Sequence, residues 1–313
     1  MIEGSAMTSR RTVLKGIAGT GAWLAAGGSN ARQPTAPGTP IKRAIPVSGE
    51  QIPVIGLGTY QAFDLTTSAA APAPLKEVLQ GLVDNGGSVV DSSPMYGRAE
   101  EMVGDLVAEL ELRSSLFLAT KVWTSGRDAG MRQMEESFGL LRTQTMDLMQ
   151  IHNLVDWKTH TGTLKQWQQQ GRVRYIGITH YHEGAYAELE RLIKTRQYDF
   201  VQLNYSIAER EAEDSMLPLA QELGVAVIAN RPFAKASLFS RARGKQLPEW
   251  AQEFDCSSWA QFFLKYIVSH PAVTCAIPAT SNPKHLADNM MAGVGRLPDA
   301  ETRRRMAKYV DEL

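Results

Sequence analysis

Residues 88–91 read SVVD and residues 92–101 read SSPMYGRAEE, and together they join an apolar run to the start of an expected helix. The run ends at Asp91, and Tyr96 follows five residues later, just before the helix. A short, continuously apolar run predicts a strand that is buried on both faces, as the strands of parallel sheets are. An acid and a phenol at the end of such a strand are two of the groups that a proton-transfer site needs.

The same strand-then-helix pattern recurs along the chain. Short apolar runs such as LFLATKVW (116–123) and MDLMQIHN (146–153) alternate with segments whose apolar residues recur at helical spacing. The expected helices span residues 74–85, 99–110, 130–142, 163–170, 184–196, 215–223, 257–269 and 283–291. Eight strand–helix units in roughly 270 residues predict an α/β fold, a (β/α)₈ or TIM barrel. A doubly wound sheet is the alternative, but the glycine-rich first turn that is typical of it is missing.

The barrel is expected to occupy residues 41–313. Its first residues, IKRAIPVSGEQIPV (41–54), predict a short hairpin with its turn at Ser48 and Gly49. The segment 234–255 is long enough to fold over a bound cofactor.

The first 40 residues are expected to lie outside the barrel. Residues 1–6, MIEGSA, resemble a cloning remnant. Arg10 and Arg11 precede a short apolar segment rich in small residues, which is the pattern of a twin-arginine export signal; a disordered basic tail is the alternative. The apolar segment is too short and too rich in glycine for stable insertion across a membrane. We therefore expect the twin-arginine machinery to export the protein to the periplasm, with residues 29–40 as a linker.

Composition limits the classes of partner. Lys and Arg number 33, Asp and Glu also 33, and the formal net charge is zero, so the sequence predicts no basic surface for nucleic acid. Cys256 and Cys275 have no spacing typical of a disulfide framework and are expected to be unpaired. His180 and His182 are spaced like metal ligands, but further ligands are not evident, so no metal site is expected.

Polar residues follow the apolar runs where strands end, and in a barrel these ends build the active site. A lysine such as Lys121 after an apolar run usually marks a strand leaving the core, and a single His152 is usually a hydrogen-bonded core residue. Together with Asp91 and Tyr96 they place four ionisable residue types on three successive strand ends. A lysine buried there needs a counter-ion, and Asp91 is the obvious one.

These four residue types suit the reduction of a carbonyl group. A free tyrosine has a pKa near 10, and a neighbouring ammonium lowers it, so Lys121 is expected to make Tyr96 a better acid. Tyr96 then gives a proton to an oxygen that gains negative charge, and a neutral His152 hydrogen-bonds the same oxygen. No side chain supplies a hydride, so a nicotinamide cofactor is implied.

The motifs SSPMYG directly after Asp91, ATKVW, LMQIHN, VQLNYS and IPATSNPKHLADN resemble those of the aldo-keto reductase family, over residues 45–298. The resemblance implies a barrel whose bottom is closed by the N-terminal hairpin, reduction of aldehydes and ketones with NADPH, and a monomer. It implies a catalytic tetrad of Asp91, Tyr96, Lys121 and His152.

The resemblance also implies a cofactor site, which matches less completely. Thr179 and Gln202 match residues that hold the nicotinamide carboxamide, but His180 stands where asparagine is expected, and Asn230 replaces an aromatic residue that stacks on the ring. Cations that often bind the 2′-phosphate of NADP are missing, so NADP(H) is expected with NAD(H) as the alternative. The expected cofactor residues are Gly58, Thr59, Tyr60, Asp91, Thr179, His180, Gln202, Asn230, Arg231, Pro232, Phe233, Ile277, Thr280, Ser281, His285, Asp288 and Asn289.

A small carbonyl compound is the expected substrate. Its pocket is expected to be lined by Tyr60, Trp123, His152, Tyr181 and Phe233. The chain ends soon after the last expected helix, which favours an open pocket and broad substrate tolerance. Two other functions are compatible with a barrel: a non-catalytic cofactor-binding sensor, resembling potassium-channel accessory subunits, and a metal-dependent hydrolase, which would need a His-x-His motif after the first strand.

Overall fold

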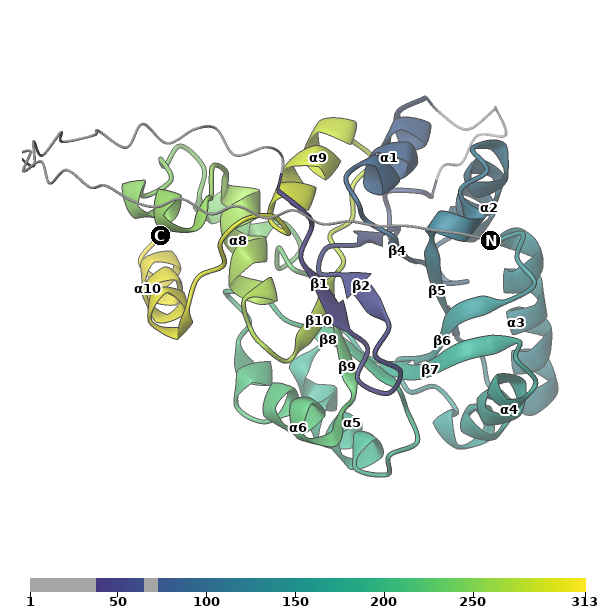
Figure 1. Ribbon diagram of the computed structural model, residues 1–313. Coiled ribbons are helices and arrows are strands. Elements are labelled where there is room, and N and C mark those ends of the chain that lie inside the picture. Colours follow the sequence, from purple (N-terminus) through teal and green to yellow (C-terminus); the bar gives the residue numbers. More distant parts are fainter. Residues whose placement is uncertain (1–37, 65–72) are drawn as a thin grey trace, which may run out of the picture. The chain divides into compact units, whose positions relative to one another are not determined.

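The computed structural model describes residues 38–64 and 73–313 (Figure 1), and these belong to one compact unit, Pro37–Leu313. The predicted export signal and most of the predicted linker lie outside the described residues. In the part of the chain that the structure describes, no helix is long and apolar enough to cross a membrane. Both cysteines are unpaired, as predicted, and both are buried.

Eight parallel strands of the described residues form the barrel (Figure 1). In order around the sheet they are β3 (Leu57–Gly58), β4 (Val89–Asp91), β5 (Phe117–Val122), β6 (Met146–His152), β7 (Val173–Thr179), β8 (Phe200–Asn204), β9 (Ala226–Asn230) and β10 (Val273–Ala276). Bridges from Ile55 to Ala276 and from Gly58 to Ala279 connect the first strand to the last. The predicted (β/α)₈ barrel is therefore confirmed.

The N-terminal hairpin closes the lower end of the barrel. Its strands β1 (Lys42–Ala44) and β2 (Gln51–Pro53) pair antiparallel around the predicted turn. Ile45 and Ile52 belong to a buried cluster with Phe117 and Phe200, which are the first residues of their strands. Because the hairpin packs against strand beginnings, the opposite, carboxyl ends remain available for a site.

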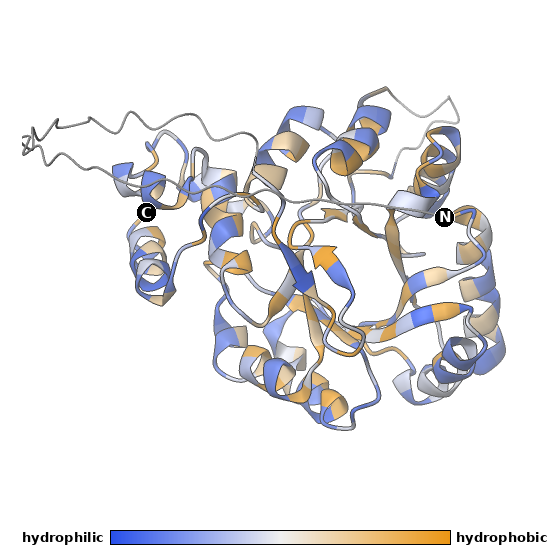
Figure 2. Cartoon of the chain, viewed as in Figure 1, coloured by the Kyte–Doolittle hydropathy of each residue, from blue (hydrophilic) through white to orange (hydrophobic). Residues whose placement is uncertain are grey.

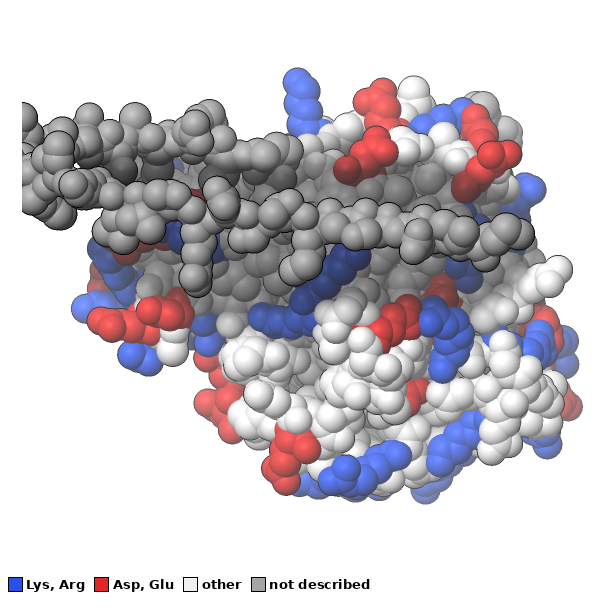
Figure 3. Space-filling model, viewed as in Figure 1, with Lys and Arg blue, Asp and Glu red and all other residues white. Residues whose placement is uncertain are grey.

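Helices cover the outside of the barrel and bury their apolar faces against it. They are α1 (Ala73–Asp84), α2 (Ala99–Glu109), α3 (Arg127–Leu140), α4 (Trp157–Gln169), α5 (Tyr186–Ile193), α6 (Met216–Leu223), α8 (Trp259–Val268) and α9 (Pro283–Met291). Figure 2 shows hydrophobic residues along most of the strands and mixed colours on the helices. On the face drawn in Figure 3, acidic and basic side chains are interspersed over the described surface.

The helix α4 begins at Trp157, six residues before the expected start at residue 163. Its first turns contain threonine, glycine and histidine, which are weak helix formers, so the sequence pattern there was poor. Tertiary contacts stabilise them instead: the Thr161 hydroxyl lies 2.6 Å from the Tyr198 hydroxyl, and His160 is fully buried.

Among the residues that the structure describes, two helices and four short 3₁₀ turns were not predicted. The helices are α7 (Ser237–Arg241) and α10 (Ala300–Asp311), and the turns are η1 (Arg113–Ser115), η2 (Glu183–Ala185), η3 (Glu211–Glu213) and η4 (Glu249–Phe254). Only Met306 and Val310 of α10 are buried, so its sequence lacks a broad apolar stripe. Instead, Arg303 fastens α10 to the barrel by donating hydrogen bonds to the Tyr205 hydroxyl and the Glu213 carboxylate, at 2.6 and 2.8 Å.

Candidate active site

A buried ion pair lies at the carboxyl ends of β4 and β5. Lys121 Nζ is 2.6 Å from Asp91 Oδ1, and it also donates to the backbone oxygen of Ser92 at 2.7 Å. Lys121 is completely buried and Asp91 is 2% exposed. Burial disfavours the ammonium, but the attraction of Asp91 and of Tyr96 outweighs it, and the pKa of Lys121 is raised. The predicted pairing is confirmed, and the lysine keeps its charge.

The Tyr96 ring lies against this pair. Lys121 Nζ is 5.0 Å from the ring centroid, and the Tyr60 ring is also at 5.0 Å. Burial raises the pKa of Tyr96, Lys121 acts in the opposite direction, Asp91 adds to the increase, and the net pKa is raised. The prediction of a lowered pKa is therefore wrong, because desolvation of the phenolate exceeds the attraction of the ammonium. Tyr96 consequently holds its proton at neutral pH.

His152, the last residue of β6, completes the tetrad. Its ring is 5.9 Å from the Tyr96 ring in an edge-on arrangement, and the Trp123 ring is 6.3 Å away. Burial lowers the pKa of His152 to about 2, and the charge of Lys121 and the nearby His180 contribute in the same direction. The imidazole is therefore neutral, as the proposed chemistry requires. All four predicted residues come together.

Two glutamines donate hydrogen bonds to the second carboxylate oxygen of Asp91, and only one of them was predicted as a site residue. Gln150 Nε2 and Gln202 Nε2 donate to Asp91 Oδ2 at 3.0 and 2.9 Å. Gln150 was not predicted, although side chains two residues apart on a strand share a face, so an inward His152 implies an inward Gln150. Asp91 is thus fixed by three donors.

The residues expected to hold the nicotinamide carboxamide also meet. Gln202 Oε1 accepts from the Thr179 hydroxyl at 3.2 Å and from Asn230 Nδ2 at 3.3 Å, and Asn230 Nδ2 also donates to the His180 carbonyl at 3.2 Å. Rotating the Asn230 amide by half a turn would place its oxygen against two other oxygens, so the orientation is determined. Asn230 Oδ1 is buried, and no hydrogen-bond partner for it lies among the described residues. An unsatisfied acceptor therefore lies beside the predicted carboxamide residues.

Aromatic residues border the tetrad where the substrate pocket was predicted. Tyr60, Trp123 and Tyr181 are 51%, 42% and 47% exposed. Tyr60 lies beside Tyr96 and Trp123 beside His152, as the ring distances above show. The Tyr181 ring stacks on His180, with centroids 5.2 Å apart. These exposed rings are available to contact a small molecule.

Residues 231–233 follow β9. Arg231 donates to the Tyr181 carbonyl at 2.6 Å and to Glu209 at 3.2 Å, so it ties this loop to the loop after β7. Pro232 is buried, and the Phe233 ring packs on Phe239 of α7, 4.7 Å away. Among the described residues, the ring contact that the structure records for Phe233 is thus with α7.

Several expected cofactor residues have structural contacts. The Thr59 hydroxyl donates to the Asp91 carbonyl at 3.0 Å, and Gly58 passes so close to β10 that an added Cβ would lie 2.8 Å from the Ile277 oxygen. Ile277 belongs to the buried cluster that contains Ile45 and Ile52 of the hairpin region. Asp288 accepts from Ser258 and Gln261 of the α8 region at 2.8 and 2.7 Å.

The start of α9 carries the remaining predicted residues. Ser281 and His285 are exposed, whereas Thr280 and Asn289 are buried. Thr280 Oγ1 accepts a hydrogen bond from the backbone N–H of Asn282, and Asn282 is the N-cap residue of α9. The exposed positions and the positive end of the helix dipole make this a suitable place for a phosphate group.

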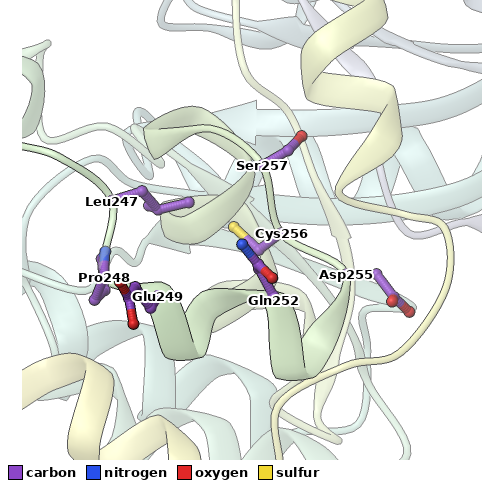
Figure 4. A pocket seen from close by; sticks show the side chains of 7 residues that line it. All are labelled: Leu247, Pro248, Glu249, Gln252, Asp255, Cys256 and Ser257. Carbon is purple, nitrogen blue, oxygen red and sulfur yellow. The ribbon is translucent and has the colours of Figure 1, made fainter.

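A surface pocket lies beside η4 (Figure 4), and none of the residues that line it belongs to the tetrad. It is lined by Leu247, Pro248, Glu249, Gln252, Asp255, Cys256 and Ser257, and most of it belongs to the segment expected to fold over the cofactor. Burial raises the pKa of the Cys256 thiol to about 11, so the thiol is protonated and a poor nucleophile. The thiol therefore gives this pocket no activated nucleophile.

Metal chemistry has no support among the described residues, where no group of three or more His, Cys, Asp or Glu is placed to hold a metal ion. The His180 and His182 rings do meet, with centroids 4.3 Å apart, but they lack further ligands of these types.

Residues 54–309 match the Aldo/keto reductase family. The chain belongs to this family. It is 27% identical over 270 residues to the methylglyoxal reductase YeaE of Escherichia coli (strain K12), an alignment that covers 83% of this chain and 92% of that relative. Similar solved structures include an aldo-keto reductase of Klebsiella pneumoniae in complex with NADPH (TM-score 0.72, 24% identity, 86% of this chain and 95% of that one). The holo form of aldo-keto reductase AKR11C1 from Bacillus halodurans is another (TM-score 0.68, 20% identity, 87% and 96%). The family resemblance expected from the motifs is confirmed.

Proposed function

We propose that this aldo-keto reductase reduces aldehydes or ketones to alcohols with NADP(H), and that Tyr96 is the general acid. The observation that carries the proposal is the buried Asp91–Lys121 pair in contact with Tyr96, with the ring of a neutral His152 5.9 Å from the phenol ring. Family membership and the name of the Escherichia coli relative support the reaction class.

Each residue of the tetrad has a separate role in the proposed reaction. The carbonyl oxygen accepts hydrogen bonds from the Tyr96 hydroxyl and the His152 ring, and these bonds strengthen as negative charge develops on it. The Tyr96 proton then moves to that oxygen, and the Lys121 ammonium stabilises the phenolate left behind. Asp91 keeps Lys121 in place and charged. NADP(H), when bound, supplies the hydride that reaches the carbonyl carbon, so that one hydride and one proton convert the carbonyl to an alcohol.

The chain's residues fit this cofactor. The unsatisfied Asn230 Oδ1, next to Thr179 and Gln202, would accept a hydrogen bond from the amide NH₂ of the nicotinamide. Thr280, Ser281 and the start of α9 suit a phosphate. The NADPH-bound structure from Klebsiella pneumoniae supports NADP(H), and NAD(H) is the competing cofactor.

The test is a fluorescence titration of the full chain with NADPH and with NADH, followed by addition of methylglyoxal or p-nitrobenzaldehyde while the absorbance of the reduced cofactor is recorded. We expect tighter NADPH binding, aldehyde-dependent oxidation, and loss of oxidation in Tyr96→Phe with binding retained. Binding without turnover of any carbonyl would favour the sensor function, and no binding of either cofactor would refute the assignment.

We further propose that the protein is an exported monomer. The paired Arg10 and Arg11 and the short apolar segment after them support the twin-arginine route. Because that route carries folded proteins, the cofactor is expected to be bound before export. Cell fractionation should place the protein in the periplasm with cofactor, and replacing both arginines by lysine should retain it in the cytoplasm. Light scattering should give the mass of one chain, and recovery of cofactor-free protein from the periplasm would contradict loading before export.

A further inference from the structure

Ser93 contacts the tetrad, although it belongs to none of the predicted sets. It lies in the loop between β4 and α2, and it is completely buried. Its Oγ is 2.9 Å from Nδ1 of His152, and it accepts a hydrogen bond from the backbone N–H of Met95 at 3.3 Å.

The serine hydroxyl carries a single hydrogen, and this limits the tautomers of His152. If Nδ1 carried the imidazole proton, it would donate to Ser93 Oγ, and the hydroxyl hydrogen would need another acceptor. Among the described residues, the structure records no other acceptor for it. A buried hydroxyl without an acceptor is unfavourable. The arrangement that satisfies every group has Met95 N–H donating to Oγ and the Ser93 hydroxyl donating to Nδ1.

We infer that Ser93 is a positioning residue, which holds the neutral His152 ring in the tautomer with its proton on Nε2. In that tautomer Nε2, the nitrogen farther from Ser93, is a hydrogen-bond donor. A carbonyl oxygen is an acceptor and needs such a donor. In the other tautomer, Nε2 would present a lone pair to that oxygen and repel it. This inference rests on the proposed function for its catalytic consequence, but the tautomer itself is a property of the free protein.

The packing around the His152 ring also favours a single tautomer. The Tyr96 ring meets the His152 ring edge-on at 5.9 Å and the Trp123 ring lies 6.3 Å away, so the imidazole has little freedom to exchange its two nitrogens by rotation. The hydrogen bond to Ser93 is the one polar contact that the structure records for this side chain among the described residues. Its loss should therefore change both the tautomer population and the ring orientation.

The first experiment uses two-bond proton–nitrogen NMR of the histidine rings in the full-length protein without cofactor. The sequence has six histidines, and His152→Gln identifies the signal of interest by its disappearance. We expect Nδ1 of His152 to have the shift of an unprotonated, pyridine-like nitrogen and Nε2 that of a protonated one. A protonated Nδ1 would overturn the inference whether or not the protein is a reductase.

The second experiment tests the role of Ser93 itself. Ser93→Ala should mix the two tautomers or broaden the ring signals, and lower kcat about fivefold, the effect of one net hydrogen bond, without changing the dissociation constant of NADPH. Ser93→Thr, which keeps a hydroxyl, should restore the tautomer. Ser137→Ala is the matched control, because it removes another fully buried serine hydroxyl, one that contacts Glu100 on the outer helices.

An unchanged tautomer and unchanged kcat in Ser93→Ala would refute the positioning role. If no carbonyl is turned over, the proposed function fails, and the NMR spectra of wild type and Ser93→Ala still decide the inference. If turnover is normal but Nδ1 is protonated, the inference fails and the proposed function stands.

Discussion

Replacing Asp91 by asparagine tests whether the buried ion pair organises this site. The Asp91 carboxylate accepts hydrogen bonds from Lys121, Gln150 and Gln202, and all of these side chains are buried. An amide of the same shape has only one acceptor oxygen, so its NH₂ group must face either the ammonium or the two glutamine NH₂ groups. The substitution therefore leaves a buried ammonium without a counter-ion and brings donors together.

The expected loss of stability follows from these contacts. Removing one partner of a buried ion pair costs about 3–5 kcal/mol, so we expect Asp91→Asn to lower the free energy of unfolding by about 4 kcal/mol. At about 2 °C per kcal/mol, the melting temperature should fall by roughly 8 °C. Lys121→Met leaves the carboxylate with its two glutamine donors and should cost less, about 2–3 kcal/mol. The double variant removes both charges, so its cost should be smaller than the sum of the single costs by about 2 kcal/mol.

The assay is equilibrium urea unfolding of the four proteins at neutral pH, followed by circular dichroism. Coincident transitions by fluorescence would verify that one free energy describes the change. If the losses in free energy of unfolding of the two single variants add up to that of the double variant within about 0.5 kcal/mol, the two charges do not interact. The reasoning from the buried pair would then be wrong. An Asp91→Asn protein as stable as wild type would refute it equally.

Three further predictions concern other parts of the molecule. Because the pKa of His152 is about 2 and that of Tyr96 is raised, the rate of carbonyl reduction should show no transition near pH 6.5. It should fall only as the pH rises through the raised pKa of Tyr96, where the proton is lost, while alcohol oxidation rises; a pH–rate profile with an inflection near neutrality would contradict this. Asn230→Ala removes the unsatisfied acceptor and should weaken NADPH binding about fivefold in a fluorescence titration, and equal affinity would show that the amide does not hold the cofactor. Gly130→Ala should destabilise the protein by about 1–3 kcal/mol, because the added Cβ would lie 2.3 Å from Cε1 of the buried His160; Gly139→Ala, with open space around it, is the control in the same urea assay.

The barrel was predictable because its strands are short apolar runs and its main helices carry apolar stripes. The four residues Leu75, Val78, Leu79 and Leu82 of α1 are all buried, as their spacing predicts. The first turns of α4 and the whole of α10 were missed, since contacts with distant residues hold them rather than a local apolar pattern. Arg303, for example, fastens α10 to a residue that is 98 positions away in the chain.

The tetrad was predictable because each member ends or follows a strand that the pattern reveals. Ser93 and Gln150, which contact the tetrad, were not predicted. The alternation along β6 indicates that Gln150 points inward, but the partners of both residues depend on what the fold places opposite them. The pKa of Tyr96 could not be predicted either. The sequence identifies the ammonium that lowers it, but the extent of burial, which dominates, is a property of the packed structure.

The raised pKa of Tyr96 is consistent with a role as proton donor. A phenol whose pKa fell below neutrality would be mostly ionised at pH 7 and would have no proton to donate, whereas Tyr96 holds its proton in the resting state. The charge of Lys121 is fixed by Asp91 before the reaction begins, so no reorganisation is needed when the phenolate forms. The attraction between that ammonium and the new phenolate is therefore stronger in the transition state than in the ground state, which is the condition for an interaction to increase the rate. In the proposed mechanism, burial raises the pKa of Tyr96 and the Lys121 ammonium lowers it, and this combination gives an acid that keeps its proton until negative charge develops on the carbonyl oxygen.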